Sequence, residues 1–194
     1  MRITFLLWLF TSLLHSQMCL AQEVTRWRGD DQSGFYPDRG LLRQWPADGP
    51  EILWHYDALG QGHSSPAFAH GRIYLSGMEG GTGYIYVLDN AGKPLWKTPY
   101  GEEFYESYPG SRSTPVIAGD KLYMLSGKGV LACLDAMSGT SNWTVDLFET
   151  YGGRNLQWGI TETPVVYKNT IICTPGGRKH NVIALDRNTG ALVW

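Results

Sequence analysis

Residues 184–194 of this chain read Ala-Leu-Asp-Arg-Asn-Thr-Gly-Ala-Leu-Val-Trp. Residues 89–96 and 135–143 show the same order of Asp, then Gly, then Trp. In each stretch the Asp and Gly have the composition of a tight turn, and the Trp follows in a short run that favours β-structure. An indole ring at one fixed place in a short repeated unit indicates a surface that packs against the next copy of that unit.

The same units open with a hydroxyl residue followed by proline. These dipeptides are Ser65-Pro66, Thr114-Pro115 and Thr163-Pro164, spaced 49 residues apart. Alternating apolar residues and tight-turn residues follow each of them, which predicts short antiparallel strands. A unit of this length cannot bury its own apolar faces, so it must stack on copies of itself. The sequence therefore predicts an all-β fold, a β-propeller of four-stranded antiparallel blades.

The predicted strands fall into three blades. The first blade is expected at 65–69, 72–77, 83–88 and 95–98, the second at 114–118, 121–126, 130–134 and 142–147, and the third at 163–167, 170–174, 181–185 and from 192 onward. A further strand is predicted over 51–59 because this stretch, with Trp54, is similar to the fourth strands. The chain is thus expected to enter the propeller at the end of a blade.

The start of the chain has the pattern of a secretory signal peptide over residues 1–21, with an apolar run over 3–14 and cleavage after Ala21. Export to the periplasm or beyond the cell follows from it. Lipid attachment at Cys19 is an alternative, but the large Met18 stands where a small residue is expected. Residues 22–50 are an irregular N-terminal segment that matches no part of the repeat, and the repeats occupy 51–194.

Three repeats and the start of a further strand amount to about half of a ring of seven or eight blades. We expect the sequence to be the N-terminal part of a longer protein that supplies the remaining blades. Two bare blade faces would expose more apolar surface than the roughly few hundred Å² that soluble monomers tolerate.

Composition narrows the class of protein. The net charge is −2 and the pI is near 6.2, which gives no basic surface for nucleic acid or an anionic membrane. No stretch after the signal peptide is apolar enough to span a membrane. Cys133 and Cys173 are expected on different strands of neighbouring blades, as two buried thiols rather than a disulfide.

The motif Ala184-x-Asp-x-x-Thr-Gly-x-x-x-Trp194 resembles the tryptophan-docking motif of the pyrroloquinoline quinone (PQQ)-like propeller family. The second repeat keeps its Asp, Ser, Gly and Trp, with Cys133 in place of Ala, and the first repeat is one residue shorter. The family includes quinoprotein dehydrogenases and BamB, a lipoprotein scaffold for outer-membrane protein assembly. Trp27-Arg28-Gly29 and Trp45-Pro46 resemble the leading segment of exported members without an assigned activity.

The candidate site lies where successive inner strands start, because these positions line one mouth of a propeller's central channel. Arg112 could pair with a carboxylate, Trp158 could stack on a ring and Glu162 could ligate a cation. His63 and Thr114 lie at the same rim, and the loops 105–108 and 154–158 lead into it. The alternative is that these residues only satisfy one another and the ends of the strands.

Two functions remain open. The first is a noncatalytic periplasmic scaffold, similar to BamB, that presents its rim to protein partners or holds a small polar ligand. The second is a PQQ-dependent oxidoreductase of the quinoprotein alcohol dehydrogenase type, with PQQ, Ca²⁺ and catalytic residues completed by later sequence. The resemblance implies an acidic base, Ca²⁺ ligands and often adjacent cysteines for such enzymes.

This sequence has no adjacent cysteines and no recognisable Glu, Asn and Asp set, which favours the scaffold. Residues 30–34 (Asp-Asp-Gln-Ser-Gly) lack the downstream Glu of a calcium loop and are expected to form an ordinary turn. No zinc, phosphate-loop or Ser-His-Asp pattern is present, so no metal site is predicted.

Overall fold

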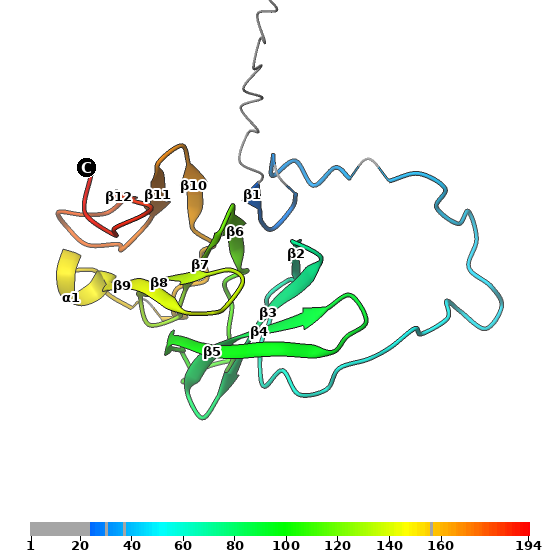
Figure 1. Cartoon of the computed structure of the whole chain (residues 1–194). Coiled ribbons are helices and arrows are strands. Elements are labelled where there is room, and N and C mark those ends of the chain that lie inside the picture. The colour runs from blue at the N-terminus through cyan, green and yellow to red at the C-terminus, as the bar shows by residue number, and fades with distance from the viewer. Residues whose placement is uncertain (1–23, 30, 37, 156) are drawn as a thin grey trace, which may run out of the picture.

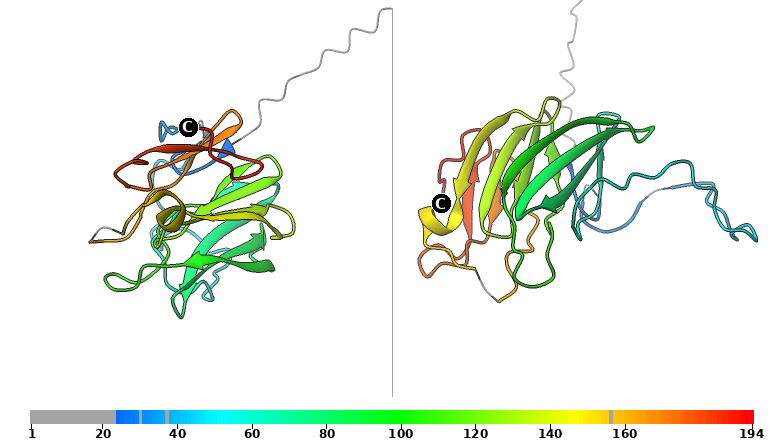
Figure 2. Two further views of the ribbon diagram at one scale, coloured as in Figure 1. Left: turned by 90° about the vertical axis from the view of Figure 1, so that its left-hand side faces the viewer. Right: turned by 90° about the horizontal axis from the view of Figure 1, so that it is seen from below.

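The computed structural model describes residues 24–29, 31–36, 38–155 and 157–194. The predicted signal peptide at 1–21 and the alternative of lipid attachment at Cys19 lie outside these residues. Three antiparallel sheets stand beside one another like the blades of a fan (Figures 1 and 2). No helix in the described part of the chain is both long and apolar enough to cross a membrane.

The strands follow the predicted succession of blades. The first blade contains β2 (Ala67–Ala69), β3 (Arg72–Glu79), β4 (Thr82–Asp89) and β5 (Pro94–Glu102). The second contains β6 (Val116–Ala118), β7 (Lys121–Leu125), β8 (Val130–Asp135) and β9 (Ser141–Asp146), and the third β10 (Val165–Tyr167), β11 (Thr170–Cys173) and β12 (Ile183–Asp186). Each inner strand begins after its proline, two residues later than predicted, because proline cannot donate a hydrogen bond to the ladder.

The strand predicted over 51–59 is wrong, because this segment forms no strand. It runs out beside the first blade, and among the described residues no neighbouring strand pairs with it (Figure 1). Segment 51–59 therefore forms no strand, since a strand without a hydrogen-bonded neighbour is not stable in water. The predicted fourth strand of the third blade is a single bridge between Leu185 and Leu192, although Val193 and Trp194 also exchange backbone hydrogen bonds with Ala184 of β12.

Two elements were not predicted. Within the segment 22–50, predicted to be irregular, β1 (Val24–Thr25) pairs antiparallel with the inner edge of β6. After β9, a short helix α1 (Leu147–Tyr151) begins where the strand predicted over 142–147 was to end. The Asp146 carboxylate caps this helix by accepting hydrogen bonds of 2.9 Å from the amides of Phe148 and Glu149.

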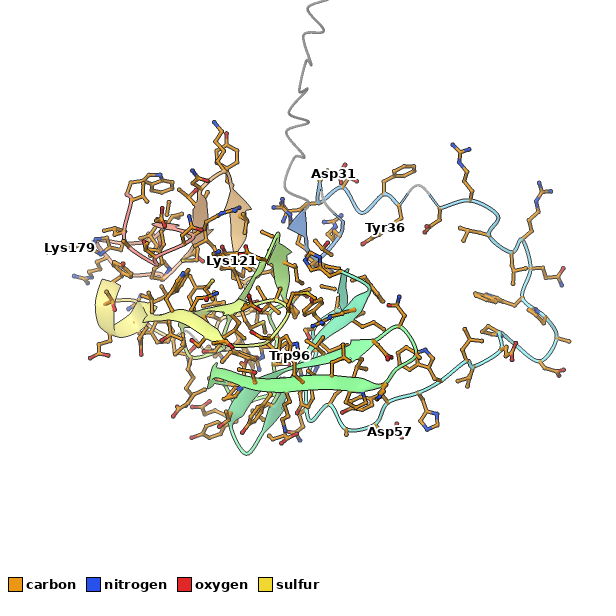
Figure 3. The ribbon with its side chains drawn as sticks, viewed as in Figure 1. Asp31, Tyr36, Asp57, Trp96, Lys121 and Lys179 are labelled. Atoms are coloured by element: carbon orange, nitrogen blue, oxygen red, sulfur yellow. The ribbon has the colours of Figure 1, made fainter. Side chains whose placement is uncertain are left out.

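The tryptophans of the repeat lie against glycines of the following turn. A Cβ on Gly139 would come within 2.7 Å of the Trp96 ring, and a Cβ on Gly190 within 2.9 Å of the Trp143 ring. Figure 3 shows Trp96 in the body of the structure, near the crossing of the first two blades. In the same way, a Cβ on Gly92 would come within 2.7 Å of the Trp54 ring, although the segment of Trp54 is not a strand. Trp54 therefore occupies the place of a preceding blade's tryptophan.

The indole N–H groups are also used between the blades. Trp96 Nε1 donates to the carbonyl of Met137 (3.0 Å), and Trp143 Nε1 donates to that of Arg187 (3.3 Å). A buried tyrosine of the second strand of the blade lies beside each indole. The ring centroids are 6.3 Å apart for Tyr74 and Trp96 and 6.1 Å apart for Tyr123 and Trp143. Each tyrosine hydroxyl also donates a hydrogen bond to a carbonyl of the turn that receives the indole N–H. Each blade thus holds the next through apolar contact and satisfied polar groups.

The receiving turns are ordered by their aspartates. Asp135 Oδ1 accepts from the amides of Met137 (2.9 Å) and Ser138 (2.7 Å), and Asp186 Oδ1 makes the equivalent bonds in the third repeat. These backbone hydrogen bonds lower the pKa of both carboxyl groups, because they stabilise the charged form. The following glycines have φ values of 74° and 73°, which side chains disfavour.

Two apolar cores fill the spaces between the blades. One is formed by the first and second blades, and the other by the second and third. Cys133 and Cys173 both belong to the second of these cores and are free and buried, which confirms the prediction of two thiols. Burial raises the pKa of Cys133 to about 11, so the thiol is held in its neutral, unreactive form.

The Trp143→Ala substitution tests the contact between the second and third blades. We expect it to lower the free energy of unfolding by about 3–5 kcal/mol, because it leaves a cavity beside Tyr123 and removes an interblade hydrogen bond. Urea unfolding followed by circular dichroism measures the loss. The control is Trp158→Ala at an exposed indole, which should lose less than about 1 kcal/mol. A loss below about 1 kcal/mol for Trp143→Ala would show that the indole does not hold the blades.

A pair of glycine substitutions separates backbone strain from ring contact. A Cβ added at Gly71 (φ 66°) would meet no atom within 4 Å, whereas a Cβ at Gly139 (φ 74°) would lie against Trp96. Gly71→Ala should cost about 1–2 kcal/mol from the left-handed backbone alone. Gly139→Ala should cost at least about 1 kcal/mol more, because the ring must move. Equal losses in chemical denaturation would mean that the ring does not depend on the glycine.

Candidate functional site

Hydrogen bonds join the start of each inner strand to the start of the next one. The amide of Ser65 donates to Thr114 Oγ1 (3.2 Å), and the amide of Thr114 donates to Thr163 Oγ1 (3.2 Å). The predicted rim residue Thr114 is therefore buried, with both its amide and its hydroxyl engaged. It joins the starts of the inner strands of successive blades.

Arg112 holds two loops of the rim together. Its Nη2 donates to the carbonyls of Ser107 (2.6 Å) and Tyr108 (2.8 Å), and its Nη1 donates to the carbonyl of Trp158. The guanidinium carbon also lies 5.0 Å from the centre of the Phe104 ring. The structure thus brings two predicted residues, Arg112 and Trp158, together, but the arginine binds backbone oxygens there.

The loops that Arg112 holds display aromatic side chains. Tyr108 is 73% exposed and Trp158 is 52% exposed, and their ring centroids lie 6.5 Å apart. Tyr108 has a left-handed backbone (φ 48°), a conformation that a bulky residue adopts only when its surroundings impose it. The hydrogen bonds of Arg112 to this turn supply that constraint.

The two tyrosines of loop 105–108 were not among the predicted site residues, although this loop was expected to lead into the rim. Tyr105 is exposed, and Lys128 Nζ lies 4.4 Å from the centre of its ring. Lys128 also pairs with Glu106 at 3.1 Å, which raises the pKa of the lysine. The aromatic composition of loop 105–108, directly before Arg112, is the sequence signal for Tyr105 and Tyr108. We call Tyr105, Tyr108 and Trp158 the rim aromatics.

Glu162 is directed to its own blade rather than to Arg112. Its carboxylate accepts a hydrogen bond from the amide of Thr174 (3.0 Å) and another from the Thr174 hydroxyl. Burial raises the pKa of Glu162 to about 7, against an ordinary value of 4.5. It borders a cavity of about 340 Å³ together with Arg154 and Asn181.

His63 lies at the rim as an exposed residue. Its amide donates to the carbonyl of Ser111 (2.8 Å), which ties the approach to the first blade to that of the second. The backbone of His63 therefore stabilises the fold, and its imidazole is exposed to solvent.

A buried carboxyl group that the sequence did not reveal lies behind the rim. Glu103 is fully buried, binds the Tyr100 hydroxyl and accepts from the amide of Gly127 (2.8 Å). Burial raises its pKa, although these hydrogen bonds and the charge of Arg112 act in the opposite direction. Glu103 joins the end of β5 to the turn between β7 and β8.

The guanidinium of Arg112 is engaged with the backbone in this arrangement. Three of its N–H donors are directed to carbonyls, so a polycarboxylate such as PQQ would have to displace at least some of these contacts to pair with Arg112. In the described part of the chain, no three His, Cys, Asp or Glu side chains gather closely enough to hold a metal ion.

A family model described as outer membrane protein assembly factor BamB matches residues 81–194, more than half of the chain. No curated protein sequence matches the chain.

Solved structures share the architecture. BamB from Moraxella catarrhalis is 23% identical with a TM-score of 0.51, over 74% of this chain and 39% of that one. A europium-containing methanol dehydrogenase is 20% identical with a TM-score of 0.55, over 74% of this chain and 26% of that one. Quinohemoprotein alcohol dehydrogenase ADHIIG from Pseudomonas putida HK5 is 22% identical with a TM-score of 0.52, over 72% and 21%. At such identities the likeness shows the fold alone, and it confirms the predicted β-propeller.

The raised pKa of Glu162 predicts how stability depends on pH. The folded chain holds the proton up to about pH 7, whereas the unfolded chain releases it near the ordinary value of 4.5. The stabilising contribution is therefore complete below about pH 4.5 and is lost as the pH rises to about 7. The buried Glu103 adds to the same trend.

Glu162→Gln should flatten this loss, leaving the part that Glu103 contributes. Urea midpoints measured at intervals between pH 4.5 and 7.5 test the expectation, with the exposed Glu149→Gln as the matched control. An unchanged slope in Glu162→Gln would show that the carboxyl group titrates equally in both states.

Proposed function

The chain belongs to the BamB-like family of PQQ-repeat β-propellers, and on that premise we propose that it is an exported, noncatalytic scaffold whose rim binds a protein partner. It spans 39% of the BamB structure and smaller shares of the dehydrogenases, so the activity and partners of a whole protein belong to this proposal. The predicted signal peptide supports export to the periplasm. The description of the family, outer membrane protein assembly, supports a partner in the assembly of envelope proteins.

The observation that carries the proposal is the contact of Arg112 with three carbonyls beneath exposed rings. Tyrosine and tryptophan are enriched among the residues that dominate protein interfaces, because they bury a large area with few rotatable bonds. A ring on a loop that is already ordered loses less conformational entropy on binding. Arg112 is therefore a positioning residue that prepares Tyr108 and Trp158 for a partner.

The second candidate is a PQQ-dependent oxidoreductase. Its support is the partly buried Glu162, whose raised pKa suits a proton acceptor near neutral pH, and the fold shared with methanol and alcohol dehydrogenases. PQQ with Ca²⁺ would supply the redox chemistry, and Arg112 would have to leave its carbonyls to bind a carboxylate. We rank this candidate below the scaffold for that reason.

Photocrosslinking tests the scaffold. We expect p-benzoylphenylalanine at position 108 or 158 to crosslink the whole protein to one partner in the native cell, because both side chains face solvent at the rim. The matched control is position 167, an exposed tyrosine of β10. The Arg112→Ala variant should weaken the crosslinks by about tenfold while the protein stays folded. Crosslinks that are equal at all three positions would contradict a rim-specific partner.

Titration with PQQ separates the two candidates. The scaffold predicts no quenching of tryptophan fluorescence at about 100 μM PQQ, with or without Ca²⁺, which corresponds to binding weaker than about −5 kcal/mol. Saturable quenching that requires Ca²⁺ and disappears in Arg112→Ala would favour the oxidoreductase instead.

A further inference from the structure

A second site lies away from the rim aromatics, between the first blade and what we call the N-terminal hook, residues 25–29 and 34–36. The hook starts at β1, which pairs with β6 through Val24 with Ala118 and Thr25 with Ile117. It turns back at once, since the amide of Gly29 donates to the carbonyl of Arg26 (3.2 Å) and that of Gly34 to the carbonyl of Arg28 (2.9 Å). Figure 3 shows Tyr36 on this segment, close to β1.

A cavity of about 800 Å³ separates the hook from β2 and the residues before it. This volume is in the range of sites that hold small organic molecules. Its aromatic walls are Trp27, Tyr36 and Phe68, of which Trp27 is 53% and Phe68 60% exposed. Ser65 adds a hydroxyl group at the strand start. The walls are thus mainly flat and apolar, with a few polar groups.

Two arginines supply the charged groups among the described residues of this cavity. Arg26 and Arg28 line it, and no described Asp or Glu does. Among the described residues, neither arginine forms an ion pair with a carboxylate. Arg72, the first residue of β3, differs because its Nη1 donates to the carbonyl of Met137 (2.5 Å). The two hook arginines therefore bring positive charge to the wall of the cavity.

One of these guanidinium groups has a buried donor without an acceptor. Arg26 Nε is inaccessible and, among the described residues, has no hydrogen-bond partner. A buried donor without a partner costs free energy, and an acceptor bound beside it would satisfy it. The guanidinium fork matches a carboxylate by two parallel hydrogen bonds.

Arg28 is held toward the same space by its backbone and by a ring. It has φ 68°, in the left-handed region that a residue with a side chain rarely adopts. Its guanidinium carbon lies 5.5 Å from the centre of the Trp27 ring, and its Nε is 3.5 Å from the position of a Cβ on Gly34. The left-handed backbone belongs to the turn of the hook and fixes the direction in which the Arg28 side chain leaves it.

We propose that the cavity between the N-terminal hook and β2 binds a carboxylate carried next to an aromatic ring, with Arg26 and Arg28 on the carboxylate and Trp27, Tyr36 and Phe68 around the ring. The same chemistry is offered by a free aromatic acid and by a peptide that ends in an aromatic residue. This site goes beyond the proposed rim function and does not depend on it, because the two share no residue.

Calorimetric titration of the purified full chain with N-acetylphenylalanine tests the proposal. We expect saturable binding below about 5 mM, and binding at least about tenfold weaker for N-acetylphenylalanine amide, which lacks the charge, and for N-acetylalanine, which lacks the ring. Acetyl-Ala-Ala-Phe identifies the source: tighter binding than N-acetylphenylalanine indicates a peptide terminus, and equal or weaker binding indicates a free acid.

Substitutions locate the site. Arg26→Gln and Arg28→Gln should each weaken the binding of N-acetylphenylalanine by about tenfold or more, as the loss of a charge-assisted pair requires. Arg178→Gln, at an exposed arginine of the third blade outside this cavity, should leave it unchanged. Circular dichroism confirms that the variants are folded. The proposal is overturned if the acid does not bind below about 5 mM, if its amide binds equally, or if neither hook variant weakens binding.

Discussion

The fold depends on an indole ring that lies against a glycine of the next repeat. The ring removes apolar area from water, and its N–H is satisfied by a carbonyl of the same turn, at Met137 for Trp96 and at Arg187 for Trp143. Only a residue without Cβ allows this approach, and the turn also needs a positive φ. The aspartate that starts the turn fixes its amides, so the receiving surface is already ordered. Blade stacking, the two cores and the position of the rim follow from this contact.

At the rim, a charged side chain orders the backbone, as the indole rings do between the blades. Arg112 is at a position where it could meet an anion, but its donors bind the carbonyls of two loops. The result is that Tyr108 and Trp158 project from a fixed backbone. The hook provides the contrast, because Arg26 and Arg28 have aromatic neighbours and no carboxylate partner among the described residues. The N–H donors of Arg112 are thus used within the fold, whereas Arg26 and Arg28 have donors that a ligand could use.

The repeat is local in sequence, and for that reason most of the fold could be predicted. Turn residues, strand alternation and the Asp, Gly and Trp order each depend on neighbours within one unit. The errors occurred where distant partners decide the structure. The pairing of β1 with β6 joins residues far apart in the chain, and the failure of 51–59 to form a strand reflects the lack of a neighbour. In the site, positions near the strand starts were foreseen, but whether Arg112 faces carbonyls or solvent is set by loop conformation. Glu103 carries no sequence signal, since its burial comes from three-dimensional packing alone.

The hydrogen bonds from Ser65 to Thr114 and from Thr114 to Thr163 use one position of the repeat both as donor and as acceptor. Such head-to-tail contacts make every boundary between units equivalent, as in an open chain of identical links. A gene duplication that adds one unit would create a boundary of the same kind as those already present. The number of units is then limited by the angle between neighbours, which decides when the ring closes, and not by any requirement for a particular partner. A propeller whose units meet in this way needs no separate kind of interface for each boundary.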